Sequence, residues 1–221
     1  MRIITGANKE YKELYNKVKE DAKAFGYKFG GYDYGDLGEG KKISVGIKNP
    51  TEYGQYVGKI PGKPLMLLSA LKDYDEFLVY VDADVRIKQP IDEVVGDYDI
   101  GVTSNDKRFH TGKEKYLYIT GFLNAGVVFI NNTEKAKEFV KEWNEEIQYT
   151  TTNSDQEALT NILRRGIKDW DITDHEINGV KVRLFPSPVY NYTGIRGECD
   201  NPKIVHFIGT LKDKLLNGVL N

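Results

Sequence analysis

The hydrophobic positions of the chain switch repeatedly between the spacing of a strand and the spacing of a helix. Short apolar runs predict strands, and longer stretches with apolar residues three or four positions apart predict helices. The expected strands cover residues 2–5, 32–34, 78–81, 98–103, 126–130, 182–185 and 204–207. The expected helices start near residues 9, 64, 134, 155 and 211. Strands that alternate with helices are typical of an α/β fold with a mainly parallel central sheet flanked by helices.

Residues with strong terminal preferences mark where several of these helices begin and end. Asn8 is expected to cap the first helix, and Gly26 to end it. Pro64 suits the first turn of the second helix, and Thr133 suits the cap of the third. The segment Ser154–Glu157 has the pattern of a capping box, which predicts the start of a fourth helix.

Composition and charge place the chain among ordinary globular proteins. Of its 221 residues, 40% are hydrophobic and 29% are charged, and the formal net charge of -2 gives no basic excess for binding nucleic acid. No apolar run reaches the roughly 18 residues of a membrane span, and the amino terminus lacks the pattern of a signal peptide. The single Cys199 excludes an internal disulfide and suits a reducing compartment. We expect one cytoplasmic domain over residues 1–221, with a nucleotide-binding part over 1–105 and an acceptor or closing part over 106–221.

The glycine-rich segment Gly30–Gly40 contains five glycines. Because glycine clusters are typical of turns, we expect this segment to be a long loop around a weak strand at Tyr32–Tyr34.

Two carboxylates, Asp82 and Asp84, follow the apolar strand Leu78–Val81. Strands of an α/β fold deliver the residues at their carboxyl ends to the crevice where ligands bind. Along an extended chain, two residues that are separated by one other residue point to the same side. Both carboxylates are therefore expected to hold one hard cation, Mg²⁺ or Mn²⁺, whose remaining ligands are usually phosphate oxygens.

Two alternative roles for this acidic strand end stay open. Aspartates are common in the turn that ends a strand. An Asp-x-Asp-x-Val strand also resembles the nucleophile motif of haloacid-dehalogenase-type phosphatases. Those enzymes usually carry the strand near the start of the chain and a second acidic motif late, whereas Gly96–Asp99 follows here almost at once. The phosphatase hypothesis is therefore the weaker one.

Three further motifs place polar groups next to predicted strand and helix ends. The segment Asn124–Gly126 is either a turn or a place where small residues let a ligand approach the backbone. The pair Asp155–Gln156 opens a helix, where it favours the helix dipole and could equally contact a sugar. His206 is followed at three-residue steps by Gly209 and Lys212. A lone histidine after a strand is more often structural, yet this spacing can supply an imidazole to a metal and an ammonium to a diphosphate.

Taken in this order, the four motifs resemble those of the family 8 glycosyltransferases, which include glycogenin and bacterial lipopolysaccharide galactosyltransferases. The matching segments are VDADV (81–85), NAGVVFIN (124–131), SDQEAL (154–159) and HFIGTLK (206–212). The opening strand at 3–11 and the segment Val189–Tyr192 also look like family elements. Each motif is weak alone, but their order over residues 3–212 is specific. The resemblance implies a single nucleotide-diphospho-sugar transferase domain with the A-type glycosyltransferase fold. The size of the chain is also similar to that of the capsid-glycosylating enzymes of large algal viruses.

The resemblance implies a role for each matched position. Asp82, Asp84 and His206 would bind a divalent metal, usually Mn²⁺ and otherwise Mg²⁺. The residues implied at the nucleotide are Thr5, Gly6, Asn8, Tyr11, Asp82 and Ala83, with Tyr11 stacked on the base. Those implied at the donor sugar are Lys63, Asn124, Ala125, Gly126, Asp155 and Gln156, and those at the diphosphate are Gly209 and Lys212.

The chain departs from the family pattern at two places. The family lysine is normally followed by Pro-Trp, whereas Asp213-Lys214 stands here. The family often places an arginine on the helix before the acidic strand, and the nearest basic residue here is Lys63, two residues out of register.

The implied reaction is transfer of a hexosyl or deoxyhexosyl group from a UDP-sugar to a glycan, glycoprotein or glycolipid. The family retains the anomeric configuration, and Asp155 and Gln156 are the catalytic candidates beside the anomeric carbon. Because an amide is a poor nucleophile, attack by the acceptor from the front face is favoured over a covalent intermediate. The alternative is a sugar-nucleotide binding module without catalysis. A nucleotidyltransferase is disfavoured, because Thr5–Asn8 lacks the glycine-rich loop with an arginine that such enzymes need.

Overall fold

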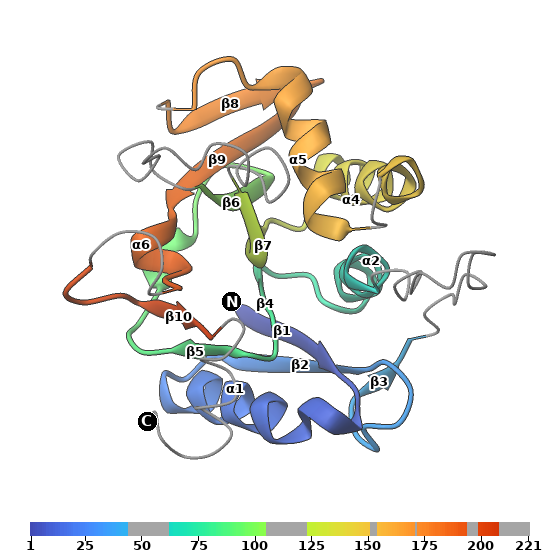
Figure 1. Ribbon diagram of the computed structural model, residues 1–221, viewed down its shortest axis with the longest axis vertical. Helices are drawn as coiled ribbons and strands as arrows, with labels where there is room; N and C mark the ends of the chain where they lie inside the picture. Colours follow the sequence, from blue (N-terminus) through green and yellow to red (C-terminus); the bar gives the residue numbers. More distant parts are fainter. Residues whose placement is uncertain (44–61, 105–122, 151–153, 171, 194–198, 208–221) are drawn as a thin grey trace, which may run out of the picture.

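Apolar strands from both halves of the chain build one eight-stranded sheet in the computed structural model, which describes residues 1–43, 62–104, 123–150, 154–170, 172–193 and 199–207 (Figure 1). In spatial order its strands are β3 (Lys41–Lys42), β2 (Lys28–Asp33), β1 (Arg2–Ala7), β4 (Leu78–Val81), β7 (Leu123–Ile130), β6 (Ile100–Ser104), β9 (Val180–Pro186) and β8 (Asp174–Ile177). The first four strands pair in parallel, as do β6 and β9, while β7 is antiparallel to both of its neighbours. The expected α/β fold with a mainly parallel sheet is confirmed.

Helices cover both faces of the sheet. The helical elements are η1 (Lys9–Tyr11), α1 (Lys12–Ala24), α2 (Lys63–Asp73), η2 (Asp92–Val94), α4 (Glu134–Glu146), η4 (Ile147–Tyr149), α5 (Asp155–Gly166) and α6 (Ser187–Tyr190). Alternation along the strands divides the core in two. Leu78 and Tyr80 of β4 belong to one core, with α2, α4 and α5, whereas Val79 and Val81 belong to the other, with α1. No helix among the described residues is long and apolar enough to cross a membrane.

The predicted caps of two helices are confirmed. Thr133 Oγ1 accepts a hydrogen bond from the Ala136 backbone N–H at 3.0 Å, and Ser154 Oγ accepts one from Glu157 N–H at 3.3 Å. The prediction for Asn8 is wrong, because its side chain makes no capping hydrogen bond, and the chain first forms the 3₁₀ turn η1. The α-helix α1 begins only at Lys12.

The prediction of a loop from Gly30 to Gly40 is wrong at its beginning, because Gly30 and Gly31 lie inside β2. A Cβ at Gly30 would lie 2.7 Å from the Ile4 side chain, and one at Gly31 would overlap the Tyr15 ring. These glycines therefore allow close packing in a parallel strand rather than a turn.

The hairpin of β8 and β9 was not predicted, although a sequence signal for it exists. Asn178 and Gly179 connect the two strands with backbone φ angles of 53° and 78°. An Asn-Gly pair between two strands is the preferred sequence of a tight hairpin turn, because both positions need positive φ.

A second, two-stranded sheet lies next to α1 and continues directly from the acidic motif. Its strands β5 (Val85–Ile87) and β10 (Ile204–His206) run antiparallel, with His206 opposite Val85. Asp21 of α1 holds β5 in place, because its carboxylate accepts two hydrogen bonds from the Arg86 guanidinium, both at 2.7 Å, and one from Ile87 N–H at 2.9 Å. This pairing fixes the place of His206 relative to the acidic motif.

Two expectations lie outside the described residues: the diphosphate residues Gly209 and Lys212, and the helix expected from residue 211.

Candidate functional site

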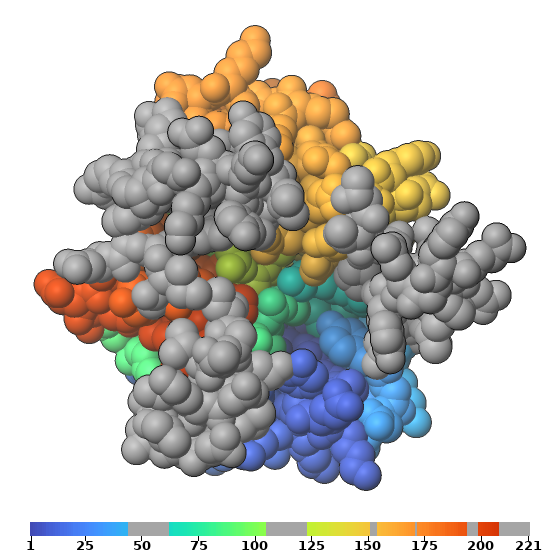
Figure 2. Space-filling view, viewed as in Figure 1, coloured from blue at the N-terminus to red at the C-terminus, as the bar shows by residue number. Residues whose placement is uncertain are grey.

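A cleft of about 370 Å³ opens at the carboxyl ends of β1 and β4. Its described lining residues are Gly6, Ala7, Asn8, Tyr11, Tyr34, Gly62, Lys63, Tyr80, Asp82, Ala83, Asp84 and Asp155. In Figure 2 the cleft lies on the visible face, where the blue, teal and green segments of the chain meet. The cleft therefore collects residues from β1, α2, the end of β4 and the start of α5, which is the edge where ligands of α/β folds bind.

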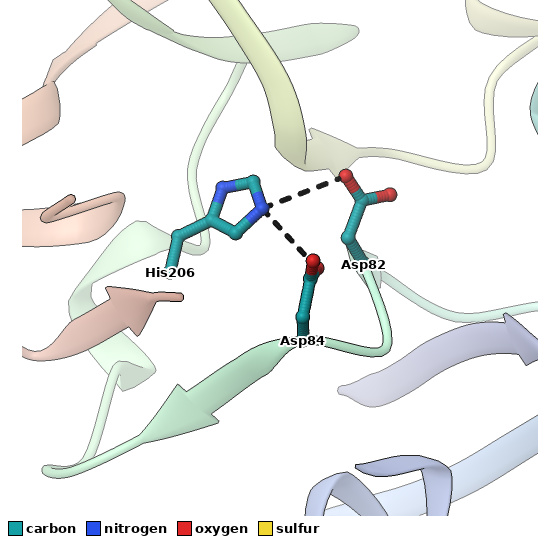
Figure 3. Close-up of side chains that lie close together, drawn as sticks. All are labelled: Asp82, Asp84 and His206. Atoms are coloured by element: carbon teal, nitrogen blue, oxygen red, sulfur yellow. Dashed lines mark ion pairs between the residues drawn. The ribbon is translucent and has the colours of Figure 1, made fainter. Parts of the chain in front are cut away.

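Asp82, Asp84 and His206 form one cluster at this cleft (Figure 3). One ligand atom from each residue lies within 4.8 Å of the other two. His206 Nε2 is 3.2 Å from Asp84 Oδ1 and 3.9 Å from Asp82 Oδ2. The structure thus brings together the three residues predicted to bind a metal.

The two carboxylates meet for a different reason from the one expected. Asp84 does not continue an extended strand, because the backbone turns after β4 and Val85 N–H donates to Asp82 O at 3.2 Å. The neighbouring strands hold this turn at both ends. Asp82 N–H donates to Gly126 O at 2.8 Å, and Phe207 N–H donates to Asp84 O at 2.9 Å.

Gly126 leaves room for the His206 imidazole. A Cβ at this position would lie 2.6 Å from His206 Nδ1, which real Cβ contacts do not reach. Gly126 was predicted to face the donor sugar, and the structure adds this packing against the proposed third metal ligand. Asn124 Oδ1 accepts a hydrogen bond from Gly126 N–H at 2.8 Å, which fixes the bend of β7 at this point.

Lys63 is a buried cation between two carboxylates. Its Nζ lies 2.8 Å from Asp155 Oδ2, 3.1 Å from Asp82 Oδ1 and 2.8 Å from Ala125 O, and the residue is 8% exposed. Burial alone would lower the pKa of Lys63, but Asp155 and Asp82 outweigh it and raise the pKa above 10.5. The ammonium therefore stays charged and links the acidic motif to the start of α5.

Tyr80 was not predicted as a site residue. Its hydroxyl donates to Asp82 Oδ1, and its ring lies 4.9 Å from Lys63 Nζ. Burial, and then the Asp82 charge, raise the pKa of Tyr80, so its hydroxyl keeps the proton that it donates. The period of two along a strand could have indicated this residue, because Tyr80 and Asp82 lie on the same side of β4.

Asp155 and Gln156 open α5, as predicted. The Asp155 carbonyl accepts a hydrogen bond from the Trp143 indole N–H at 2.7 Å, which ties the helix start to α4. Asp155 lines the cleft, whereas Gln156 is directed to Ala125, whose N–H lies 3.4 Å from Gln156 Oε1.

Near the carboxyl end of β1, two buried oxygens have no hydrogen-bond partner among the described residues. They are Thr5 Oγ1 and Asn8 Oδ1. Gly6 packs against the Tyr34 ring, because a Cβ there would meet its carbons. Buried polar atoms are normally hydrogen-bonded, so Asn8 Oδ1, whose residue lines the cleft, can serve a polar ligand.

The structure divides the predicted site residues into three groups. Those that line the cleft are Gly6, Asn8, Tyr11, Lys63, Asp82, Ala83, Asp84 and Asp155. Those that are absent from the lining are Thr5, Asn124, Ala125, Gly126, Gln156 and His206. Gly209 and Lys212 form the third group, because they lie outside the described residues.

The donor set of the cluster fits a divalent metal. Two carboxylates and one imidazole are ligands that suit Mn²⁺, whereas Mg²⁺ favours oxygen alone. The separations of 3.2 Å and 3.9 Å place the ligand atoms around one point rather than in separate pairs.

Comparison with known proteins finds one matching family model and several similar structures. A family model of nucleotide-diphospho-sugar transferases matches residues 66–214. A glycosyltransferase involved in glycosylation of the major capsid of PBCV-1 has a similar structure, with a TM-score of 0.60 at 13% identity over 96% of this chain and 98% of that chain. The galactosyltransferase LgtC, in complex with donor and acceptor sugar analogs, gives 0.53 at 17% identity over 95% and 87%. GlyE of Streptococcus pneumoniae TIGR4 gives 0.55 at 14% identity over 94% and 54%. No curated protein sequence matches the chain. The structural matches confirm the predicted A-type glycosyltransferase fold.

The substitution Gly126→Ala should displace the His206 imidazole, because the new Cβ requires its space. We expect the Kd for Mn²⁺ to rise by about tenfold or more, as for the loss of a group that orients a ligand. Electron paramagnetic resonance of free Mn²⁺ during a titration measures this Kd. In a His206→Ala background the same substitution should have little further effect, and an undiminished effect there would contradict the steric origin of the change.

The substitution Lys63→Met should destabilise the metal-free protein, because it leaves Asp82 and Asp155 facing each other without a cation. Breaking a buried ion pair of this kind costs about 3 kcal/mol. Since the folded-state pKa of Lys63 is raised, its contribution is complete below pH 10.5 and is lost as the pH rises through the folded-state value, so it is fully present at pH 7. Urea unfolding at pH 7 measures the loss. Lys63→Arg keeps the charge and is the control, and an equal loss in both variants would show that packing rather than charge is responsible.

Proposed function

The chain belongs to the nucleotide-diphospho-sugar transferase family, and from this we propose that it transfers a hexosyl or deoxyhexosyl group from a UDP-sugar to a glycan, glycoprotein or glycolipid in a metal-dependent, retaining reaction. One observation carries the proposal. The Asp82–Asp84–His206 cluster adjoins the same cleft as Asp155 and Lys63, so a cation, a diphosphate and a sugar can lie side by side. The phosphatase hypothesis has no support from the family.

The donor extends in this proposal from the end of β1 to the start of α5. Tyr11 stacks on the base, and Asn8 Oδ1, which has no hydrogen-bond partner among the described residues, accepts a hydrogen bond from it, with Gly6 and Ala83 giving close access. A uracil ring offers one N–H donor, which suits this acceptor. Thr5 is fully buried on β1 next to these residues and completes this part of the proposed nucleotide site.

The metal in this proposal is Mn²⁺, held by Asp82, Asp84 and His206. When bound, such an ion neutralises charge on the diphosphate leaving group. The chain's own part is to hold the three ligand atoms together through the turn after β4 and through the pairing of β5 with β10. Gly209 and Lys212 complete the diphosphate contacts in the proposal.

The sugar lies next to Lys63, Asp155 and the segment Asn124–Gly126 in this proposal. Positive charge develops on the sugar ring as the leaving group departs, and the Asp155 carboxylate stabilises it. Asp155 Oδ2 is already paired with Lys63 at 2.8 Å, which weakens it as a nucleophile. Gln156 is an amide and cannot replace it, so we favour attack by the acceptor hydroxyl on the face that the leaving group vacates. This geometry retains the anomeric configuration.

The substitution Asp84→Asn tests the metal-dependent reaction. We expect turnover of UDP-sugars to fall by about 100-fold or more, because losing a ligand should cost at least as much as losing a group that merely orients one. Release of UDP, measured with Mn²⁺ and with a chelator across a panel of UDP-sugars, gives the rates.

Asp97→Asn is the matched control, since Asp97 is an exposed partner of Lys181 outside the cleft. Activity that persists in Asp84→Asn or in the chelator would contradict the metal assignment. Donor binding without any hydrolysis or transfer would instead indicate a binding module.

A further inference from the structure

We propose that Asn191 is a positioning residue of the metal site. It holds a proton on His206 Nδ1, and so leaves Nε2 to offer its lone pair to an ion shared with Asp82 and Asp84. The inference rests on the proposed metal-dependent function, but the tautomer itself can be observed in the metal-free protein.

Asn191 is fully buried and lies beside β10. It follows α6 directly, and its backbone N–H donates to Ser187 O at 2.9 Å. The next residue, Tyr192, runs along β10, because its N–H donates to Ile204 O at 2.9 Å and its carbonyl accepts from His206 N–H at 2.8 Å. Figure 1 shows α6 and β10 next to each other on this side of the molecule. The backbone therefore fixes the Asn191 side chain next to the His206 ring.

Hydrogen bonding decides which end of the Asn191 amide faces the histidine. The Asn191 Nδ2 group lies 3.2 Å from the Asn124 carbonyl oxygen and 2.8 Å from Thr103 Oγ1. A backbone carbonyl can only accept, so the NH₂ group must be on that side. Thr103 Oγ1 donates its own proton to Asn124 O at 3.1 Å and is therefore free to accept from Asn191. A flipped amide would place two oxygens against each other, so a single orientation satisfies the network.

This orientation leaves Asn191 Oδ1 at 3.0 Å from His206 Nδ1. An amide oxygen has no proton to give, so Nδ1 must carry the proton that joins them. In the neutral ring that metal binding requires, the lone pair is then on Nε2, which lies 3.2 Å from Asp84 Oδ1 on the metal side. His206 is 5% exposed, so little water competes for Nδ1. Metal-binding histidines commonly have such a partner on the second nitrogen, and losing it weakens metal binding.

The Asn191 amide also connects His206 to the bend of β7. It binds Asn124 O, while the Asn124 side chain holds Gly126 N–H, and Gly126 packs against the imidazole ring. The ring is therefore fixed on two sides, by a hydrogen bond at Nδ1 and by contact with Gly126. The segment Val189–Tyr192 resembles a family element, but the resemblance implied no role for it. The contacts of Asn191 now give this segment a physical role.

Two variants of Asn191 and two measurements test the proposal. Nitrogen-15 NMR of the imidazole rings in the metal-free protein reports the His206 tautomer, with the other two histidines as internal references. We expect a proton on Nδ1 in the wild type and a mixture of tautomers in Asn191→Ala. The Kd for Mn²⁺ should rise about 10- to 100-fold in Asn191→Ala. Asn191→Asp keeps an acceptor for Nδ1 and should keep the proton there, with a Kd closer to that of the wild type than in Asn191→Ala, although its second oxygen faces Asn124 O and should lower the stability of the fold.

Thr103→Val is the matched control, because it alters the same network but leaves Asn191 Nδ2 its bond to Asn124 O. It should preserve the tautomer and the Kd. A wild-type ring with a proton on Nε2 and none on Nδ1, or an unchanged Kd in Asn191→Ala, would overturn the proposal. If Asn191→Ala does not fold, the position of the ring proton in the wild type and in Asn191→Asp still tests the proposal. Absence of Mn²⁺ binding in a wild type with the predicted tautomer would instead refute the proposed metal dependence.

Discussion

The antiparallel pairing of β5 with β10 is the constraint on which the whole site depends. It places His206 opposite Val85, and the hydrogen bond from Phe207 N–H to Asp84 O continues the pairing into the acidic turn. Because side chains alternate along a strand, a slip of one residue would turn His206 away from both carboxylates. The bidentate contact of Asp21 with Arg86 holds β5 against α1 and so opposes such a slip. His206 and the two aspartates lie far apart in the sequence, and this one strand pairing brings them together.

Charge balance is the second condition for such a site. Asp82, Asp84 and Asp155 gather at one cleft, and carboxylates this close repel each other. Lys63 offsets this repulsion through ion pairs with Asp82 and Asp155, while Asp84 faces His206. Lys63 therefore connects Asp82 of the metal motif to Asp155, the residue proposed beside the sugar. A substitution of either aspartate should change the ion pair that Lys63 makes with the other.

The sequence predicted what depends on local pattern, and it missed what depends on long-range contacts. Strand β4 and the capped helices α4 and α5 followed from periodicity and terminal residues, whereas the convergence of Asp82, Asp84 and His206 was implied by the family resemblance. The Asn191–His206 contact followed from neither, because it joins two segments through a side chain that no short motif reports. The loop prediction was wrong at Gly30 and Gly31 for the same reason. The side chains that pack against these glycines, Ile4 and Tyr15, lie elsewhere in the chain. The hairpin at Asn178–Gly179, by contrast, has a local sequence signal, because an Asn-Gly pair favours such a turn.

The central claim is that Asp82, Asp84 and His206 hold one divalent ion together with the diphosphate of the donor. Pulsed electron paramagnetic resonance of the protein with Mn²⁺ and UDP tests it most directly. The account predicts that the same ion couples magnetically to one imidazole nitrogen and to phosphorus. The nitrogen coupling should vanish in His206→Ala, while the phosphorus coupling remains. An ion coupled to phosphorus but to no protein nitrogen in the wild type would contradict the account.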